Sequence, residues 1–266
     1  MATFLLPINV VIIRCLIVLS LSLAMLSIAK AADEHDAQPI VDVTLATGKH
    51  YSPFVDASLP DGGWSVSIVK GVLEEMSLSY SLTILPWERA LKWTREDKLF
   101  ATFPYVYSER RAKTLLYSNP INFVPVHMYV AKHADFSDIE SLTNKRLCFP
   151  YDYALSTLEK EVVDKLSMTV NRVKDSTGCI RHVHKGWSDA GLINGHINAD
   201  KLSLDNNLIK IFPKQIVAVP LSLVINKSRE NAQAWMDQFN NALTIINNNG
   251  ERALIDQQYY LLLNQH

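Results

Sequence analysis

The sequence lacks several features that would assign it to a familiar functional class. It has no block of basic residues, and its formal net charge is −1, so nothing in its composition supports nucleic-acid binding. It has no internal repeat and no low-complexity linker. Its only closely spaced histidines, His182 and His184, would point about 200° apart on a helix, so they could not share a metal ion there. No cofactor and no metal site are therefore expected.

Cysteine is also scarce, with three residues in the chain. The first, Cys15, starts an uncharged stretch, Cys15–Ile28, which is preceded by Arg14 and followed by Ala29-Lys30-Ala31. A positive flank, an apolar run and a small-x-small site predict a cleavable export signal at residues 1–31, and hence a periplasmic protein. Because residues 4–13 are themselves mostly apolar, an uncleaved membrane anchor is the alternative. Cleavage would leave 235 residues, enough for two lobes.

Cys148 and Cys179 would be the two cysteines of the exported protein. An even number of cysteines in an oxidising compartment favours one disulfide bond. This bond would close a loop of about 30 residues and contribute about 3 kcal/mol on the loop-entropy model. The alternative is a pair of buried free thiols.

Strand-like and helix-like patterns alternate along the chain, which predicts an α/β fold. An alternating stretch at residues 41–47 favours a first strand, and helical spacing over 64–76 precedes a second strand at 80–85. Near the end of the chain, apolar residues from Ala232 to Ile246 recur on one stripe at helical spacing, which predicts a long helix. Phe100–Tyr105 is expected to form a buried strand that stops at Pro104. Arg110 and Arg111 follow that strand end, where ligands bind in open α/β sheets and where a guanidinium can clamp a carboxylate. Alternatively, both arginines are ordinary surface residues.

The segment around these arginines resembles a family signature. Ser108-x-x-Arg111-Ala112-Lys113, followed by Tyr117-Ser118-Asn119-Pro120, is similar to the lobe-one motif of the extracytoplasmic solute-binding proteins of family 3. That family includes the amino-acid-binding components of ABC importers. In its usual motif, Thr-x-x-Arg-Ala-Lys precedes Phe-Ser-Asp-Pro, and the arginine binds the ligand carboxylate. The resemblance covers nearly all of the chain after about residue 40 and assigns this role to Arg111.

The resemblance implies a two-lobed periplasmic binding protein fold of type II, in which each lobe is a mixed sheet flanked by helices. Lobe 1 would be discontinuous, with residues 40–126 and 218–266, and lobe 2 would hold residues 127–217. Extended runs at Phe123–Ala131 and Ile216–Ile225 would be the two crossover strands. The protein is expected to be a monomer whose closed form is read by an ABC importer permease or a membrane sensor.

Aromatic residues follow several predicted strand ends and would line the cleft. Tyr51 and Phe54 resemble the Tyr-x-Pro-Phe segment of the family, although Phe54 could equally be a core residue. Trp87 and Arg89 either face the cleft or only fix a helix to the sheet. The full set of predicted ligand-binding residues is Arg111, Tyr51, Phe54, Trp87, Arg89, Tyr105, Tyr151, Tyr153 and Asn194.

The sequence departs from the family pattern at three places. The serines before the arginine motif are replaced by Phe103, Pro104 and Val106. Counted from Arg146, the Gly-(Ser/Thr)-Thr positions that open a helix toward the ligand hold Asp152, Tyr153 and Ala154, so glycine and the serine or threonine hydroxyls are replaced. Asn194 stands where many amino-acid binders have an aspartate that pairs with the ligand ammonium, and it carries no charge.

These observations predict a solute-binding protein, not an enzyme, that captures a small polar, carboxylate-bearing solute. One alternative is an exported enzyme on the same fold, as in cyclohexadienyl dehydratases, with Glu109, Asp152 or His50 as its acid or base. Another is a sensor or partner-binding protein whose cleft no longer takes a solute.

Overall fold

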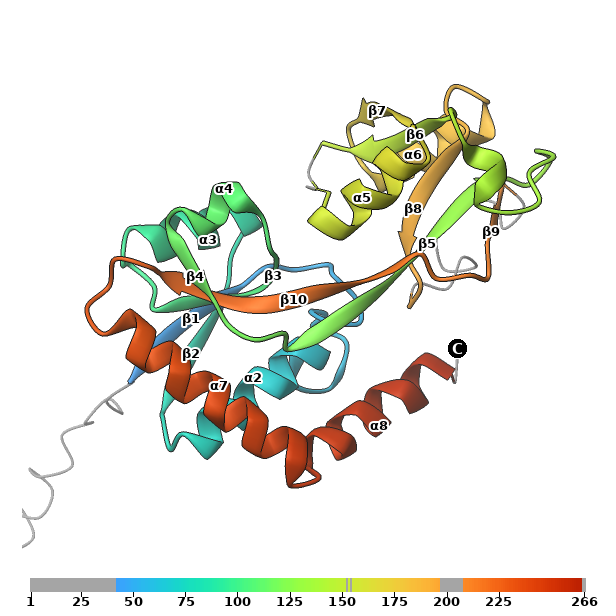
Figure 1. The fold of residues 1–266 in the computed structure, drawn as a ribbon. Helices are drawn as coiled ribbons and strands as arrows, with labels where there is room; N and C mark the ends of the chain where they lie inside the picture. Colours follow the sequence, from blue (N-terminus) through green and yellow to red (C-terminus); the bar gives the residue numbers. More distant parts are fainter. Residues whose placement is uncertain (1–41, 152, 154, 197–207, 265–266) are drawn as a thin grey trace, which may run out of the picture. The chain divides into compact units, whose positions relative to one another are not determined.

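The structure, a computed structural model, describes residues 42–151, 153, 155–196 and 208–264 (Figure 1). The predicted export signal at residues 1–31 lies outside the described residues. Within the described ranges, no helix combines the length and the apolar character that a membrane span requires.

The first part of the chain forms a parallel sheet flanked by helices. β1 (Val43–Thr47) lies between β2 (Tyr80–Ile84) and β3 (Ala101–Val106), and both neighbours run parallel to it. α2 (Trp64–Glu75) follows β1, and α3 (Trp87–Arg95) follows β2. Parallel strands point their carboxyl ends the same way, so the segments after β1, β2 and β3 emerge at one edge of the sheet.

Pro104 does not end β3 as the sequence predicted, because the strand continues to Val106. In the pairing of β3 with its antiparallel neighbour, Thr102 faces Val224 and Tyr105 faces Ser222. The two residues between them on β3 therefore oppose a single residue, which is a β-bulge. A bulge interrupts the ladder of hydrogen bonds between the strands. The absence of a backbone N–H at Pro104 is therefore tolerated at this position.

Two long strands connect the first part of the fold to the second. β5 (Asn122–Ala131) and β10 (Val217–Asn226) pair antiparallel with each other from Asn122↔Leu221 to Val126↔Val217. These bounds agree to within one residue with the predicted crossover strands. Before β5, α4 (Glu109–Ala112) and β4 (Leu115–Tyr117) complete the first part, and β4 pairs with the far end of β10.

The second part of the fold repeats the arrangement of parallel strands with helices between them. Its elements are β6 (Arg146–Pro150), α5 (Thr157–Lys165), β7 (Thr169–Val173), α6 (Ser176–His184), β8 (Ala190–Asn194) and β9 (Ile209–Ile211). β6 runs parallel to both β7 and β8, and β8 and β9 each pair with β5. Two short 3₁₀ turns, Pro60–Gly62 and Glu140–Leu142, lie in the connections of the two parts. The carboxyl ends of β6, β7 and β8 share one edge.

Each part has its own hydrophobic core. We call lobe 1 the part with β1–β4, α2–α4 and the two C-terminal helices, and lobe 2 the part with β6–β9, α5 and α6. In lobe 1, α7 (Ala232–Asn248) and α8 (Glu251–Asn264) pack on α2 (Figure 1). Lobe 2 holds two smaller clusters, one around Met128 and Leu142 and one around Cys148 and Cys179.

The structure buries the apolar stripe that the sequence predicted on α7. Met236, Phe239, Leu243 and Ile246 recur at helical spacing, and all four are buried in the lobe 1 core. Phe239 is fully buried and stacks on Trp235 with ring centroids 5.5 Å apart. Burying one face at a period of 3.6 residues is what stabilises a surface helix.

We expect Phe239→Ala to lower the free energy of unfolding by about 3–5 kcal/mol, because it removes a large buried side chain and leaves a cavity. Ile245→Ala on the same helix is the control, since Ile245 is half exposed, and it should change stability by less than about 1 kcal/mol. Urea denaturation followed by circular dichroism measures both values. Similar effects of the two substitutions would contradict the assignment of this helix face to the core.

Candidate functional site

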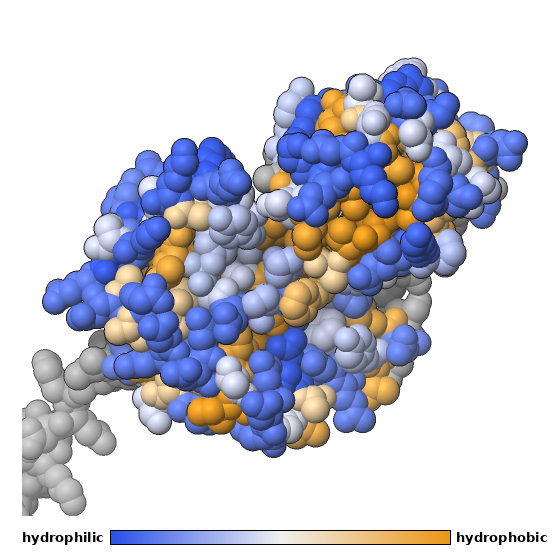
Figure 2. Space-filling model, viewed as in Figure 1, coloured by the Kyte–Doolittle hydropathy of each residue, from blue (hydrophilic) through white to orange (hydrophobic). Residues whose placement is uncertain are grey.

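A cavity of about 430 Å³ lies where the strands of both lobes end. Apolar surface is visible on lobe 2 over the region of α5 and β8 (Figure 2). Carboxyl ends of parallel strands are the usual place for a ligand in an α/β sheet. The residues that line the cavity are His50, Tyr51, Ser52, Asp56, Val106, Val124, Val126, Tyr129, Phe149, Pro150, Tyr153, Glu159, Ser176, Ile180, Leu192, Ile193, Asn194 and Val219.

The loop after β1 forms the lobe 1 wall of the cavity. Tyr51 and Val55 exchange two backbone hydrogen bonds of 2.9 Å, which fold this loop back on itself. The Asp56 carboxylate accepts hydrogen bonds from the backbone N–H and the hydroxyl of Ser58 at 3.0 and 2.7 Å. These bonds, the hydroxyl first, lower the pKa of Asp56, so this carboxylate is ionised at neutral pH. Asp56 thus brings a negative charge and a rigid loop to the site.

A row of aromatic rings supports this wall from behind. Tyr51 contacts Phe54 at a centroid distance of 5.3 Å and Trp87 at 6.1 Å, and Trp87 contacts Tyr105 at 5.5 Å. The Trp87 ring lies directly over Gly48, where an added Cβ would come within 1.9 Å of the indole. The Tyr105 hydroxyl donates to the Trp87 carbonyl at 2.9 Å. The row therefore holds Tyr51 in place at the cavity.

The lobe 2 wall is built around the start of α5. Ser156 is the N-cap, and its hydroxyl accepts from the Glu159 N–H at 3.1 Å while Glu159 Oε2 accepts from the Ser156 N–H at 2.7 Å. This reciprocal pair is a capping box. The helix thus opens on Ser156 and Thr157, whose hydroxyl groups follow residues 152–154 in the chain.

Three oxygen-bearing side chains from both lobes, Tyr51, Tyr153 and Glu159, line the cavity. Burial raises the pKa of Tyr51 well above its ordinary value, and Tyr153 and Glu159 raise it further by Coulomb repulsion. Burial also raises the pKa of Glu159, against the lowering effect of its hydrogen bonds to Ser156. Tyr51 of lobe 1 therefore contributes to the same cavity wall as Glu159 and Tyr153 of lobe 2.

The end of β8 meets lobe 1 at one margin of the cavity. Asn194 Nδ2 donates to the Ser52 carbonyl at 3.5 Å, and Asn194 Oδ1 accepts from the His196 N–H at 3.0 Å. The His196 ring packs against Phe54 and Trp64 at centroid distances of 5.8 and 5.6 Å. The Asn194 amide is therefore already engaged by the backbone of both lobes.

The sequence matches the family model of the bacterial extracellular solute-binding proteins, family 3, over residues 43–261. The chain belongs to this family. No curated protein matches the sequence.

Three solved structures illustrate how the family fold recurs. An ancestral arginine-binding protein bound to arginine has a TM-score of 0.61 at 16% identity, over 82% of this chain and 97% of that one. A probable amino-acid ABC transporter extracellular-binding protein from Bacillus subtilis has a TM-score of 0.64 at 16% identity, over 82% and 96%. A histidine kinase sensor domain with similarity to periplasmic binding proteins has a TM-score of 0.62 at 14% identity, over 82% and 96%. These likenesses confirm the predicted two-lobed fold.

Arg111, the predicted anchor of this solute-binding protein, lies beside the cavity and not among the residues that line it. One guanidinium nitrogen donates to the carbonyl of Val106, a lining residue, at 3.3 Å, and the guanidinium carbon is 5.5 Å from the centre of the Tyr105 ring. Its Nε is buried and has no hydrogen-bond partner among the described residues. No described acidic side chain forms an ion pair with it. Arg110, in contrast, is exposed.

The structure sorts the other predicted ligand-binding residues into three groups. Tyr51, Tyr153 and Asn194 line the cavity together. Phe54 is fully buried, and it lies with Trp87 and Tyr105 in the layer behind Tyr51. The remaining two are exposed on their own lobes, Arg89 on α3 and Tyr151 after β6.

Sequence reasoning missed two charged residues of the cavity, Asp56 and Glu159. The pattern Ser156-x-x-Glu159 ahead of a helix is a capping-box signature and could have located the start of α5. Of the residues considered for an enzyme, His50 lines the cavity, Glu109 lies in the first turn of α4, and Asp152 is outside the described residues.

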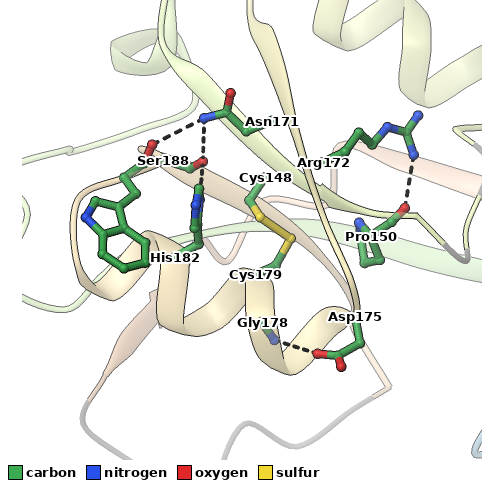
Figure 3. The surroundings of a disulfide bond; sticks show 10 residues. Cys148, Pro150, Asn171, Arg172, Asp175, Gly178, Cys179, His182 and Ser188 are labelled. Atoms are coloured by element: carbon green, nitrogen blue, oxygen red, sulfur yellow. Dashed lines mark hydrogen bonds between the residues drawn. A yellow bond between two sulfur atoms is a disulfide. The ribbon is translucent and has the colours of Figure 1, made fainter.

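The predicted disulfide is present and joins β6 to α6 in lobe 2 (Figure 3). Cys148 lies on β6, next to the lining residue Phe149, and Cys179 lies on α6, next to the lining residue Ile180. The Cα atoms of the two cysteines are 5.4 Å apart. Asp175 caps α6 by accepting from the Gly178 N–H at 2.7 Å.

We expect the double substitution Cys148→Ala/Cys179→Ala to lower the free energy of unfolding by about 3–4 kcal/mol, the value of closing a loop of this length. Urea denaturation of the variant and of the wild type measures the difference. As a control, a reductant should destabilise the wild type and leave the variant unchanged. A loss below about 1 kcal/mol would show that the bond contributes little to lobe 2.

His196 should make stability depend on pH. Burial first, and then His127, lowers the pKa of His196 below its ordinary value of 6.5. The unfolded chain therefore takes up a proton as the pH falls through about 6.5, while the folded protein resists it, so stability is lost on acidification. The melting temperature should fall less between about pH 7.5 and 5.5 in His196→Gln than in the wild type. An equal decrease in melting temperature in His196→Gln and in the wild type would contradict a role of His196 in the pH dependence. His133→Gln, which changes a histidine at an exposed site, is the control.

Proposed function

We propose that this protein is a periplasmic solute-binding protein that captures a small, polar, amino-acid-like solute between its two lobes. The observation that carries the proposal is the cavity at the strand ends of both lobes. Its volume of about 430 Å³ lies within the range of about 300–1,000 Å³ that small-molecule sites occupy. Its lining is mainly apolar with a few polar side chains, which is the usual composition of a site that orients one ligand.

We propose that Arg111 binds a carboxylate of this solute. Its guanidinium makes one hydrogen bond, to the Val106 carbonyl at the cavity wall, so most of its five donors remain for a ligand. Its buried Nε has no described partner, and such a donor gains most from an incoming acceptor. A charged hydrogen bond of this kind contributes about 1.5–3 kcal/mol.

The two lobes would close on the solute by bending in the strands that connect them. In this proposal lobe 1 is residues 40–126 with 218–266, lobe 2 is residues 127–217, and residues 1–31 direct export as a cleavable signal. The protein acts as a monomer, and a membrane partner reads the closed form. The structural neighbours include both an ABC transporter binding protein and a histidine kinase sensor domain, so an importer permease and a sensor are the two kinds of partner to test.

A ligand screen tests the proposal. Protein expressed from the full-length sequence is purified, and its thermal unfolding is followed with amino acids, dicarboxylates, polyamines and aromatic acids. A solute present at 100 times its dissociation constant should add about 2.7 kcal/mol, or about 5–11 °C in melting temperature for a protein of this size. Absence of any stabilising compound, or chemical turnover of the stabilising compound, would contradict a solute-binding role.

Arg111→Ala should weaken binding of the stabilising compound by about tenfold to a hundredfold, because it removes a charged hydrogen bond to the carboxylate. Isothermal titration calorimetry measures the affinity. Arg110→Ala is the matched control, since it removes the same charge from the neighbouring, exposed position. Equal losses in the two variants would mean that only the local positive potential matters, and no loss in Arg111→Ala would refute the anchor.

A further inference from the structure

The lobe 2 end of the cavity continues beneath α6. Side chains alternate between the two faces of a strand. Tyr129 of β5 and Ile193 of β8 face the same side as α6, because they belong to one hydrophobic cluster with Ile180 of that helix. All three line the cavity, and so do Pro150 at the end of β6 and Ser176 at the start of α6. We call these five residues the α6 subpocket.

Tyr129 lies in this subpocket because of a glycine on the neighbouring strand. In the pairing of β5 with β8, Tyr129 is opposite Gly191. A Cβ added to Gly191 would lie 2.2 Å from Cζ and 2.3 Å from the hydroxyl oxygen of Tyr129. The phenol ring therefore lies across β8, and its hydroxyl group is carried away from its own strand. Any larger residue at position 191 would displace the ring.

The hydroxyl group of Tyr129 has no hydrogen-bond partner among the described residues. Burial alone raises the pKa of Tyr129, with no contribution from a hydrogen bond or a charge. Tyr129 has 2% of its surface exposed, but its hydroxyl is not one of the fully enclosed polar atoms without a partner, as Arg111 Nε is. It therefore opens into the cavity that Tyr129 lines. Buried tyrosine hydroxyls usually find a partner, so this one is available to a ligand.

The α6 subpocket contains no charged side chain. The ionisable residues among the other described residues that line the cavity are His50, Tyr51, Asp56, Tyr153 and Glu159. They lie on lobe 1, in the segment that leads into α5, or on α5 itself. A charge brought into apolar surroundings without a partner is costly, whereas an uncharged polar group needs only a hydrogen bond. The subpocket therefore suits an apolar chain with one uncharged polar group at its end.

We propose that Tyr129 is a specificity-determining residue, whose hydroxyl group hydrogen-bonds an uncharged polar group at the end of the solute's side chain. The inference rests on the proposed function and adds the class of side chain, which is apolar along its length and polar at its tip. A phenol hydroxyl both donates and accepts, so a hydroxyl, an amide or a carbonyl would fit. The competing interpretation is that Tyr129 only fills the space above Gly191.

Tyr129→Phe separates the two interpretations, because it keeps the ring and removes the hydroxyl. Without a ligand, this substitution should not lower the melting temperature, since no hydrogen bond inside the protein is lost. Tyr259→Phe is the matched control: Tyr259 is also buried, but its hydroxyl donates to the Pro60 carbonyl at 2.5 Å and lies 2.9 Å from the Ser67 hydroxyl. The control should lower the melting temperature by about 2–4 °C, the value of one hydrogen bond. A similar loss in Tyr129→Phe would show that its hydroxyl is already paired and would overturn the inference.

The binding probes are amino acids that differ at the tip of the side chain. L-tyrosine is compared with L-phenylalanine, and L-glutamine is compared with L-norleucine and with the charged L-glutamate. Isothermal titration calorimetry measures the dissociation constants. We expect the wild type to bind tyrosine or glutamine about fivefold or more tightly than its apolar counterpart. Tyr129→Phe should reduce this preference to less than about twofold, and Tyr259→Phe should keep it.

A preference that persists in Tyr129→Phe would overturn the inference and leave Tyr129 as a packing residue. Tighter binding of the apolar counterparts by the wild type, or of glutamate than of glutamine, would also overturn it. In each of these cases the binding of an amino acid would still support the proposed function. If none of these probes binds, the inference fails, and the proposed function stands only if another compound of the ligand screen stabilises the protein.

Discussion

The antiparallel pairing of β5 with β10 is the constraint on which the rest of the structure depends. β10 continues from this pairing into lobe 1, where it joins β3 and β4, and β5 continues into lobe 2, where it joins β8 and β9. One continuous sheet therefore fixes the register of both lobes (Figure 1). Val124, Val126 and Val219 of the paired strands line the cavity, so the element that joins the lobes also supplies part of the binding surface.

The sequence predicted the parts of the fold that depend on local periodicity. The crossover strands and the buried stripe of α7 agree with the structure because each is specified by a single repeating pattern of apolar residues. Pro104 was interpreted wrongly because its effect depends on a bulge in the pairing with β10, a strand more than a hundred residues away. No local pattern carries that information.

The candidate site could be predicted less well, because it too depends on contacts between segments that are distant in the sequence. Tyr51, Tyr153 and Asn194 could be found because they follow strand ends, but which aromatic rings face the cavity and which lie behind it depends on packing. Glu159 was missed because a capping residue has a sufficient structural explanation within its own helix. Only the three-dimensional structure shows that the same side chain also lines the cavity, together with Tyr51 of the other lobe.

The contact between Trp87 and Gly48 has a consequence for how this binding surface can diversify. The indole occupies the space where any other residue at position 48 would place its Cβ, so a substitution there would dislodge Trp87 and, through it, the ring of Tyr51. A change of ligand preference is therefore easier to reach through the loop residues after Tyr51 or through the lobe 2 wall. We therefore expect a relative with different ligand selectivity to keep glycine at position 48 and to differ at other residues of the cavity wall.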